Sequence, residues 1–203
     1  MRETTLYWLP ECEDFRARAR SLLVAEAPPT WAELVAFANH NLDFVQTNTL
    51  DQILVKHYGA GAASPSVKSL RVAILGSSTV THLHAGLRVA ALRRGLHVHT
   101  YEAEYGQYRQ ELVDSLSPLH RFRPHVVLFA LDAHHLTQGL RPGLDGPQAA
   151  GALQQVLASI RECWALAKEA FDCTVLQQTA LPIWHDLMGS NEHRLPGSRA
   201  HFL

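Results

Sequence analysis

From Leu70 onward, short aliphatic runs alternate with stretches of helical periodicity, and this alternation constrains the fold more than any other feature of the chain. The aliphatic runs predict strands over residues 72–75, 97–101, 126–130 and 174–176. The stretches between them predict helices over residues 83–94, 107–114 and 148–171. Because runs such as "VAIL" are apolar on both faces, we expect parallel strands that helices cover on both sides. The fold class predicted is α/β, a three-layer α/β/α sandwich with a parallel, flavodoxin-like sheet.

The first part of the chain has a different texture and predicts helices alone. Thr30 and Glu33 have the spacing of a capping box at the start of one of them. The expected helices cover residues 14–25, 31–42 and 43–56. We therefore predict two domains, a helical N-terminal extension over residues 1–60 and an α/β domain over residues 68–203. The stretch after Leu181 is irregular, without a closing strand and helix, so we expect the α/β domain to continue beyond Leu203.

Charge and composition exclude several classes of partner. The formal net charge of −1 gives no electrostatic reason to bind nucleic acid or an anionic membrane surface. No apolar run reaches the roughly 18 residues that span a bilayer, and the N-terminus lacks the apolar core of a signal peptide. The 3 cysteines share no CxxC spacing. Reduced thiols and a cytoplasmic location are the expectation.

Polar side chains follow each predicted strand. The first strand leads into Gly76-Ser77-Ser78-Thr79 and the third into Asp132-Ala133-His134-His135. The second and fourth are followed by residues 102–109 and 177–179. Because ligands of open parallel sheets bind at the carboxyl ends of the strands, four polar strand ends together predict a site there.

The hydroxyl residues after the first strand allow three interpretations. Ser77, Ser78 and Thr79 would cap the next helix, since Ser and Thr accept hydrogen bonds from its first N–H groups. They would alternatively form an anion cradle at that helix N-terminus. In the third interpretation a serine is a nucleophile, and backbone N–H groups hold the oxyanion.

The sequence contains the phrases "YEAEYGQYRQE" and "NEHRLPGS" within a stretch that runs from "ANHNLDFVQTNTL" to "GSNEHRLPGS". This stretch resembles the N-terminal domain of FkbH-like proteins. Those proteins join an SGNH-hydrolase-like domain to a haloacid-dehalogenase-like domain. The resemblance implies an SGNH-like sheet and a part in loading a glyceryl unit, taken from 1,3-bisphosphoglycerate, onto an acyl carrier protein in polyketide or related biosynthesis. The implied partners are that carrier protein and a haloacid-dehalogenase-like domain on the same longer polypeptide. This chain itself has no DxDG motif of the second domain.

Matched by position, "GSS" corresponds to the Gly-Asp-Ser of SGNH hydrolases. Ser78 then matches the nucleophile and Ser77 replaces the usual aspartate. Gly106 matches the glycine whose N–H helps to hold the oxyanion, together with the Ser78 amide. Asp132 stands where the family has an asparagine. This is a departure, because an ionised carboxylate repels an oxyanion unless its pKa is raised.

SGNH hydrolases carry their general base in a DxxH motif near the C-terminus. No DxxH follows the fourth strand, so the base is expected beyond Leu203, with His134 and His135 as accessory catalytic groups beside Asp132. His185 and His193, in the terminal stretch, are further candidates.

Substrate contacts are expected from Ser77, Thr79, Gln107 and Arg109. The Arg109 guanidinium suits a phosphate or phosphopantetheine group, and the alternative is a solvated rim at the strand end. No metal site and no cofactor are expected, and His97 and His99, on one face of a strand, are interpreted as core residues.

Three functions remain open from the sequence. The first is an SGNH-like ester hydrolase or acyltransferase that acts through Ser78. The second is a non-catalytic module that docks a carrier protein or the haloacid-dehalogenase-like partner. The third is a sheet that binds a nucleotide or phosphate at residues 76–79.

Overall fold

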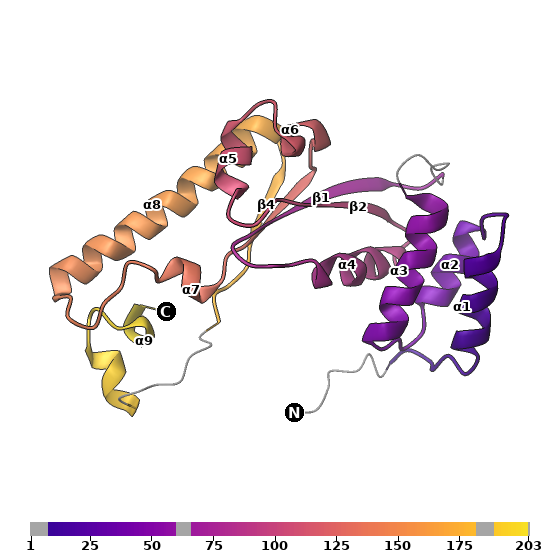
Figure 1. Ribbon diagram of the computed structural model, residues 1–203, viewed down its shortest axis with the longest axis horizontal. Coiled ribbons are helices and arrows are strands. Elements are labelled where there is room, and N and C mark those ends of the chain that lie inside the picture. Colours follow the sequence, from indigo (N-terminus) through magenta and orange to yellow (C-terminus); the bar gives the residue numbers. More distant parts are fainter. Residues whose placement is uncertain (1–7, 60–65, 182–188, 203) are drawn as a thin grey trace. The chain divides into compact units, whose positions relative to one another are not determined.

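The computed structural model describes residues 8–59, 66–181 and 189–202 and contains a parallel sheet (Figure 1). Its 4 strands lie in the order β2-β1-β3-β4. They are β1 (Ser69–Gly76), β2 (His97–Glu102), β3 (Val126–Ala130) and β4 (Thr174–Gln177). This is the flavodoxin-like order for the first four strands, in which the strand order reverses between β1 and β3. The predicted α/β/α class, with helices flanking a parallel sheet, is confirmed.

The helices agree with the sequence pattern where they are long. Those described are α1 (Phe15–Val24), α2 (Trp31–Ala38), α3 (Phe44–Tyr58), α4 (His82–Leu92), α5 (Tyr108–Val113), α6 (Pro118–Phe122), α7 (Ala133–Leu136), α8 (Gly146–Phe171) and α9 (Arg199–Phe202), with the 3₁₀ helix η1 (Gly189–Arg194). The sequence did not predict α6, α7, η1 or α9, because such short helices show no hydrophobic period. The capping box of Thr30 and Glu33 is confirmed. α2 ends at Ala38 and not at the expected residue 42. The next residue, Asn39, closes the helix, because its side chain and its N–H both donate to the Val35 carbonyl.

The chain divides into two compact units. The first contains residues 1–71 and 81–100, and the second residues 72–80 and 101–203. In the first, Val89 and Leu92 of α4 are buried in one core with the apolar faces of α1, α2 and α3. Residues 81–100 thus belong to the same unit as the N-terminal helices, in addition to the residues 1–60 that the sequence assigned to the N-terminal extension.

A bidentate ion pair joins α4 to α3 within the first unit. Arg88 donates through Nε and Nη2 to the two carboxylate oxygens of Asp51, each at 2.6 Å. Arg88 also donates to the hydroxyl of Thr100. Because Asp51 is buried, its charge depends on this guanidinium.

Substitution Arg88→Met is expected to lower the free energy of unfolding by about 3–5 kcal/mol, because it leaves the Asp51 carboxylate buried without its cation. The double variant Asp51→Leu/Arg88→Met removes both charges and should recover most of this loss. Urea denaturation of the wild type, the single and the double variant checks this. Equal losses in the single and the double variant would contradict it.

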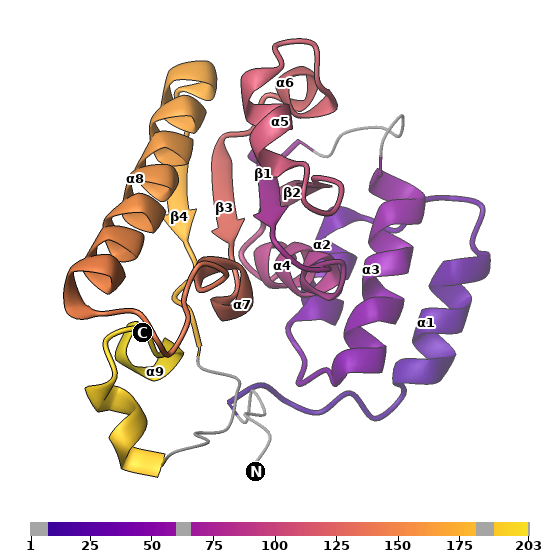
Figure 2. The same ribbon diagram turned by 60° about the vertical axis from the view of Figure 1, so that its left-hand side comes forward.

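The second unit contains the carboxyl-terminal part of β1 with β3, β4 and the helices α5, α6 and α8. Fully buried Val127 and Phe129 of β3 share its core with Leu119 of α6, and Cys163 and Ala167 of α8 are also buried there. Asp145 and Gln148 form a capping box at the start of α8. The 26 residues of α8 span about 39 Å, whereas the 5 residues of β3 span about 17 Å. α8 therefore runs past the sheet toward α7 and α9 (Figure 2).

None of the helices in the described part of the chain combines the length and the apolarity that crossing a membrane requires.

Candidate functional site

The point where the strand order reverses lies between the carboxyl ends of β1 and β3. Gly76 pairs with Ala130 in the sheet, and the Ser77 N–H donates to the Ala130 carbonyl at 3.2 Å. The buried Ser77 hydroxyl accepts the N–H of Asp132 at 2.8 Å. Ser77 therefore ties the two strand ends together, and its hydroxyl, predicted to touch substrate, is committed to this bond.

The chain bends sharply after β1. A Cβ atom on Gly76 would lie 2.8 Å from the Ser78 carbonyl oxygen and 3.1 Å from a methyl carbon of Val80. Only glycine leaves room for this bend, which places Ser78 and Thr79 on the exposed surface. The N-cap residue of α4 is Thr81, two residues beyond Thr79. The interpretation of residues 77–79 as helix caps is therefore wrong.

Ser78 and Thr79 line an open hollow of about 310 Å³. The other residues that line it are Glu102, the last residue of β2, and residues 103–105 directly after it. Glu102 accepts the N–H of Val80 at 3.1 Å, which holds this segment to the bend after β1. The hollow thus combines hydroxyl groups with two carboxylates at the carboxyl ends of β1 and β2, next to the point where the strand order reverses.

Asp132 stands beside the serine hydroxyls. Its carboxylate accepts the N–H of His135 at 2.8 Å, as the N-cap of α7. Burial raises the pKa of Asp132, but this N–H, the hydroxyls of Ser77 and Ser78 and the charge of His135 lower it by more, so the pKa lies below its usual value. Asp132 is then ionised at neutral pH and cannot donate a hydrogen bond to an oxyanion. It acts as an acceptor next to Ser78.

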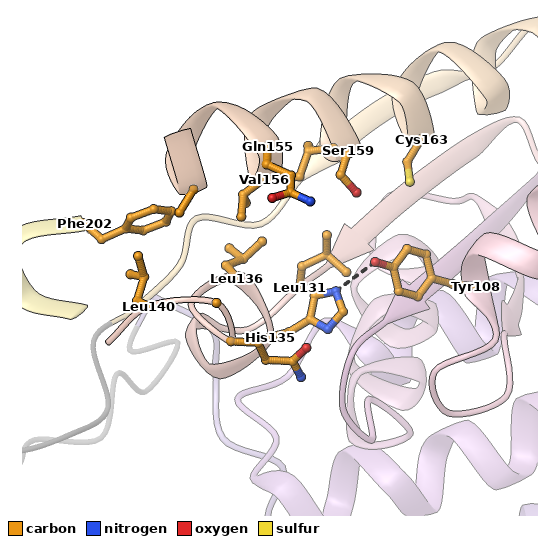
Figure 3. Close-up of a pocket in the computed structure, with 14 residues that line it drawn as sticks. Tyr108, Leu131, His135, Leu136, Leu140, Gln155, Val156, Ser159, Cys163 and Phe202 are labelled. Carbon is orange, nitrogen blue, oxygen red and sulfur yellow. Dashed lines mark hydrogen bonds between the residues drawn. The ribbon is translucent and has the colours of Figure 1, made fainter. Parts of the chain in front are cut away.

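The histidines after β3 do not line the hollow of Ser78. His135 Nε2 lies 2.9 Å from the hydroxyl of Tyr108 and borders a different cavity (Figure 3). His134 is exposed. His193 bonds the carbonyl of Ala200 within the terminal segment, and His185 lies outside the described residues. Of the residues that the structure describes, no histidine lines this hollow.

The predicted residues around α5 have separate positions. Gly106 has a left-handed backbone (φ 72°) in the turn before the helix, and Gln107, its N-cap residue, donates to Glu104 at 3.2 Å. Arg109 Nη2 contacts Glu162 of α8 at 2.6 Å. Gly106, Gln107 and Arg109 are not among the residues that line the hollow. An anion could bind Arg109 only in competition with Glu162.

Two histidines on β2 had been interpreted as core residues. His97 is buried and stacks near His99, with ring centroids 4.3 Å apart. The pKa of His97 is lowered, first by burial and then by His99. Its Nδ1 atom has no hydrogen-bond partner. Across residues 8–59, 66–181 and 189–202, no three His, Cys, Asp or Glu side chains gather as metal ligands.

Asp132 supplies a test of this arrangement by pH. Because its pKa is lower in the folded than in the unfolded chain, its contribution to stability is present above about pH 3.9 and is lost as the pH falls through the folded value. Asp132→Asn keeps an oxygen that can cap α7 but loses the charge. The wild type is expected to be more stable than this variant at pH 6, and the difference should disappear toward pH 2. Chemical denaturation across that range measures it, and a pH-independent difference would refute the assignment.

Residues 71–201 match the model of a family described as FkbH, N-terminal domain. The fold is similar to the crystal structure of the N-terminal part of the protein BF1531 from Bacteroides fragilis, which contains a phosphatase domain and is complexed with Mg. The TM-score is 0.56 at 19% identity, over 86% of this chain and 39% of that one. This likeness shows a shared fold, and the chain spans about two fifths of its neighbour. No curated protein matches.

Proposed function

The chain belongs to the FkbH N-terminal domain family, and from this premise we propose that it is an SGNH-like acyl-handling domain. It takes part in transferring a glyceryl-type acyl unit to an acyl carrier protein in polyketide or related biosynthesis. Its partners are that carrier protein and a haloacid-dehalogenase-like phosphatase domain on the same polypeptide. The phosphatase domain in the protein of similar fold supports the second partner.

One observation carries the catalytic part of the proposal. The Ser78 side chain is exposed on a sharp bend at the carboxyl end of β1, beside an open hollow. A nucleophilic serine needs this placement, since its oxygen must reach the substrate carbonyl while neighbouring backbone N–H groups remain available. Ser77 cannot take this part, because it is buried and bonded to Asp132.

In the proposed reaction Ser78 Oγ attacks the acyl carbonyl carbon and loses its proton to a base. The Ser78 N–H is assigned to the oxyanion, and the Gly106 N–H is the second donor that the family resemblance implies, although Gly106 does not line the hollow. The bond to the leaving group breaks as that group takes up a proton. The thiol of the carrier protein then attacks the serine ester, which forms the thioester and returns the proton to Ser78. The ionised Asp132, with its lowered pKa, orients the hydroxyl but is too weak a base for it. The reaction therefore requires a base beyond the described residues of the hollow.

A second candidate function rests on this same requirement. Glu102 and Glu104 line the hollow, whereas no histidine does so in the part of the chain that the structure describes. A domain that has kept the fold and lost the base would serve to dock the carrier protein or the phosphatase partner without catalysis.

Ser78→Ala is expected to lower kcat/KM for p-nitrophenyl acetate by at least about 100-fold, because it removes the attacking oxygen. Ser115→Ala is the matched control, since Ser115 is an exposed serine that does not line the hollow, and it should retain activity within about 3-fold. Full activity in Ser78→Ala would exclude the catalytic proposal. An inactive wild type that forms a complex with a carrier protein would instead establish the docking function.

A further inference from the structure

A second cavity, of about 350 Å³, lies beside α8 and shares no lining residue with the hollow of Ser78. It follows from the length of α8, whose first half runs beyond the end of β3. On the other side stand the single turn of α7 and the loop after it, which are too short to fill the space under such a helix. Figure 3 shows side chains from both sides converging on this space.

The walls of the cavity combine apolar side chains with neutral polar ones. From α8 come Ala152, Val156, Ile160 and Cys163, at the spacing of one helix face. The facing apolar side chains are Leu131, Leu136, Leu140 and Phe202. Phe202 is held there by the buried Ser198, whose hydroxyl donates to the Glu192 carbonyl at 2.6 Å and accepts the His201 N–H at 3.1 Å.

One pair of polar side chains faces this space with a donor to spare. The hydroxyl of Tyr108 and Nε2 of His135 share one hydrogen bond of 2.9 Å. Burial raises the pKa of Tyr108, so its phenol keeps the proton. A phenol and a neutral imidazole together carry two donors, and their mutual bond uses one of them. When Nε2 carries the proton and donates to the phenol oxygen, the Tyr108 O–H remains for a hydrogen-bond acceptor in the cavity.

The cavity carries no formal charge in its lining apart from what His135 could acquire. None of the residues that line it is Asp, Glu, Lys or Arg. The nearby Arg109 donates to Ser159, which does line the cavity, and its charge is paired with Glu162. Gln138 and Gln155 add neutral amide groups. An ion in such a space would lose its hydration without a countercharge.

We propose that this cavity binds an uncharged, mostly aliphatic small molecule with a carbonyl group, its chain between α8 and Leu136 and its carbonyl oxygen on the Tyr108–His135 pair. A volume of about 350 Å³ lies within the range of small-molecule sites. The site is independent of Ser78, so it stands whether or not the proposed function does.

The test uses N-butylbutanamide as a neutral probe and octanoate as an anionic probe with the same number of heavy atoms. Titration followed by NMR should give a Kd of about 1–10 mM for the amide, as expected for so small a ligand. Octanoate should bind at least about 10-fold more weakly, because no Lys or Arg lines the cavity to neutralise its carboxylate. The amide should also slow the alkylation of Cys163, but not that of Cys12, by N-ethylmaleimide.

Two alanines of α8 provide matched variants. Ala152 lines the cavity, whereas Ala158 is exposed and does not. Ala152→Leu should weaken amide binding at least about 10-fold by filling the space, and Ala158→Leu and Ser78→Ala should leave it unchanged. Equal binding of the amide to the two alanine variants, or equal affinity for octanoate, would overturn the proposal. Loss of esterase activity in Ser78→Ala with retained amide binding would separate the two sites.

Discussion

The bond between the Ser77 hydroxyl and the Asp132 N–H is the interaction on which the site depends. It joins the loops after β1 and β3 at the place where the strand order reverses. Because Ser77 is drawn inward, the sharp bend at Gly76 turns the next residue, Ser78, outward. The same bond places the Asp132 carboxylate where it can cap α7 and accept from Ser78. One buried hydroxyl thus determines which of two adjacent serines can meet a substrate.

The family resemblance implies an asparagine at the position of Asp132, and these two side chains have opposite effects on an oxyanion. An asparagine at this position would donate to an oxyanion, but a carboxylate whose pKa is lowered can only accept. The donors left for an oxyanion are then backbone N–H groups. The negative charge nearby, with Glu102 and Glu104 lining the hollow, would oppose a second negative charge on an oxyanion. An acyl reaction here would have to offset that repulsion, which is why the docking function remains a physical alternative.

The second constraint is the length of α8. A helix that only covered the sheet would need to match strands of 4 or 5 residues, and α8 is far longer. Its first half must then find other partners, which are α7, the loop that follows it and α9. The lining of the space between them contains no Asp, Glu, Lys or Arg, and His135, expected from the sequence beside Asp132 as an accessory catalytic group, borders it. The two hollows therefore have different chemistry, one with carboxylates in its lining, the other with apolar and neutral polar side chains.

The sequence by itself determined the strands, the long helices and the α/β class. These features depend on apolar periodicity and on residues next to one another in the chain, and local physics is enough to predict them. The tertiary structure decided that Ser77 binds Asp132, 55 positions away, that Arg109 binds Glu162, 53 positions away, and that His135 turns to Tyr108, 27 positions away. Such partners depend on strand register and helix packing, where many side chains compete for each contact. The local sequence pattern therefore does not predict them.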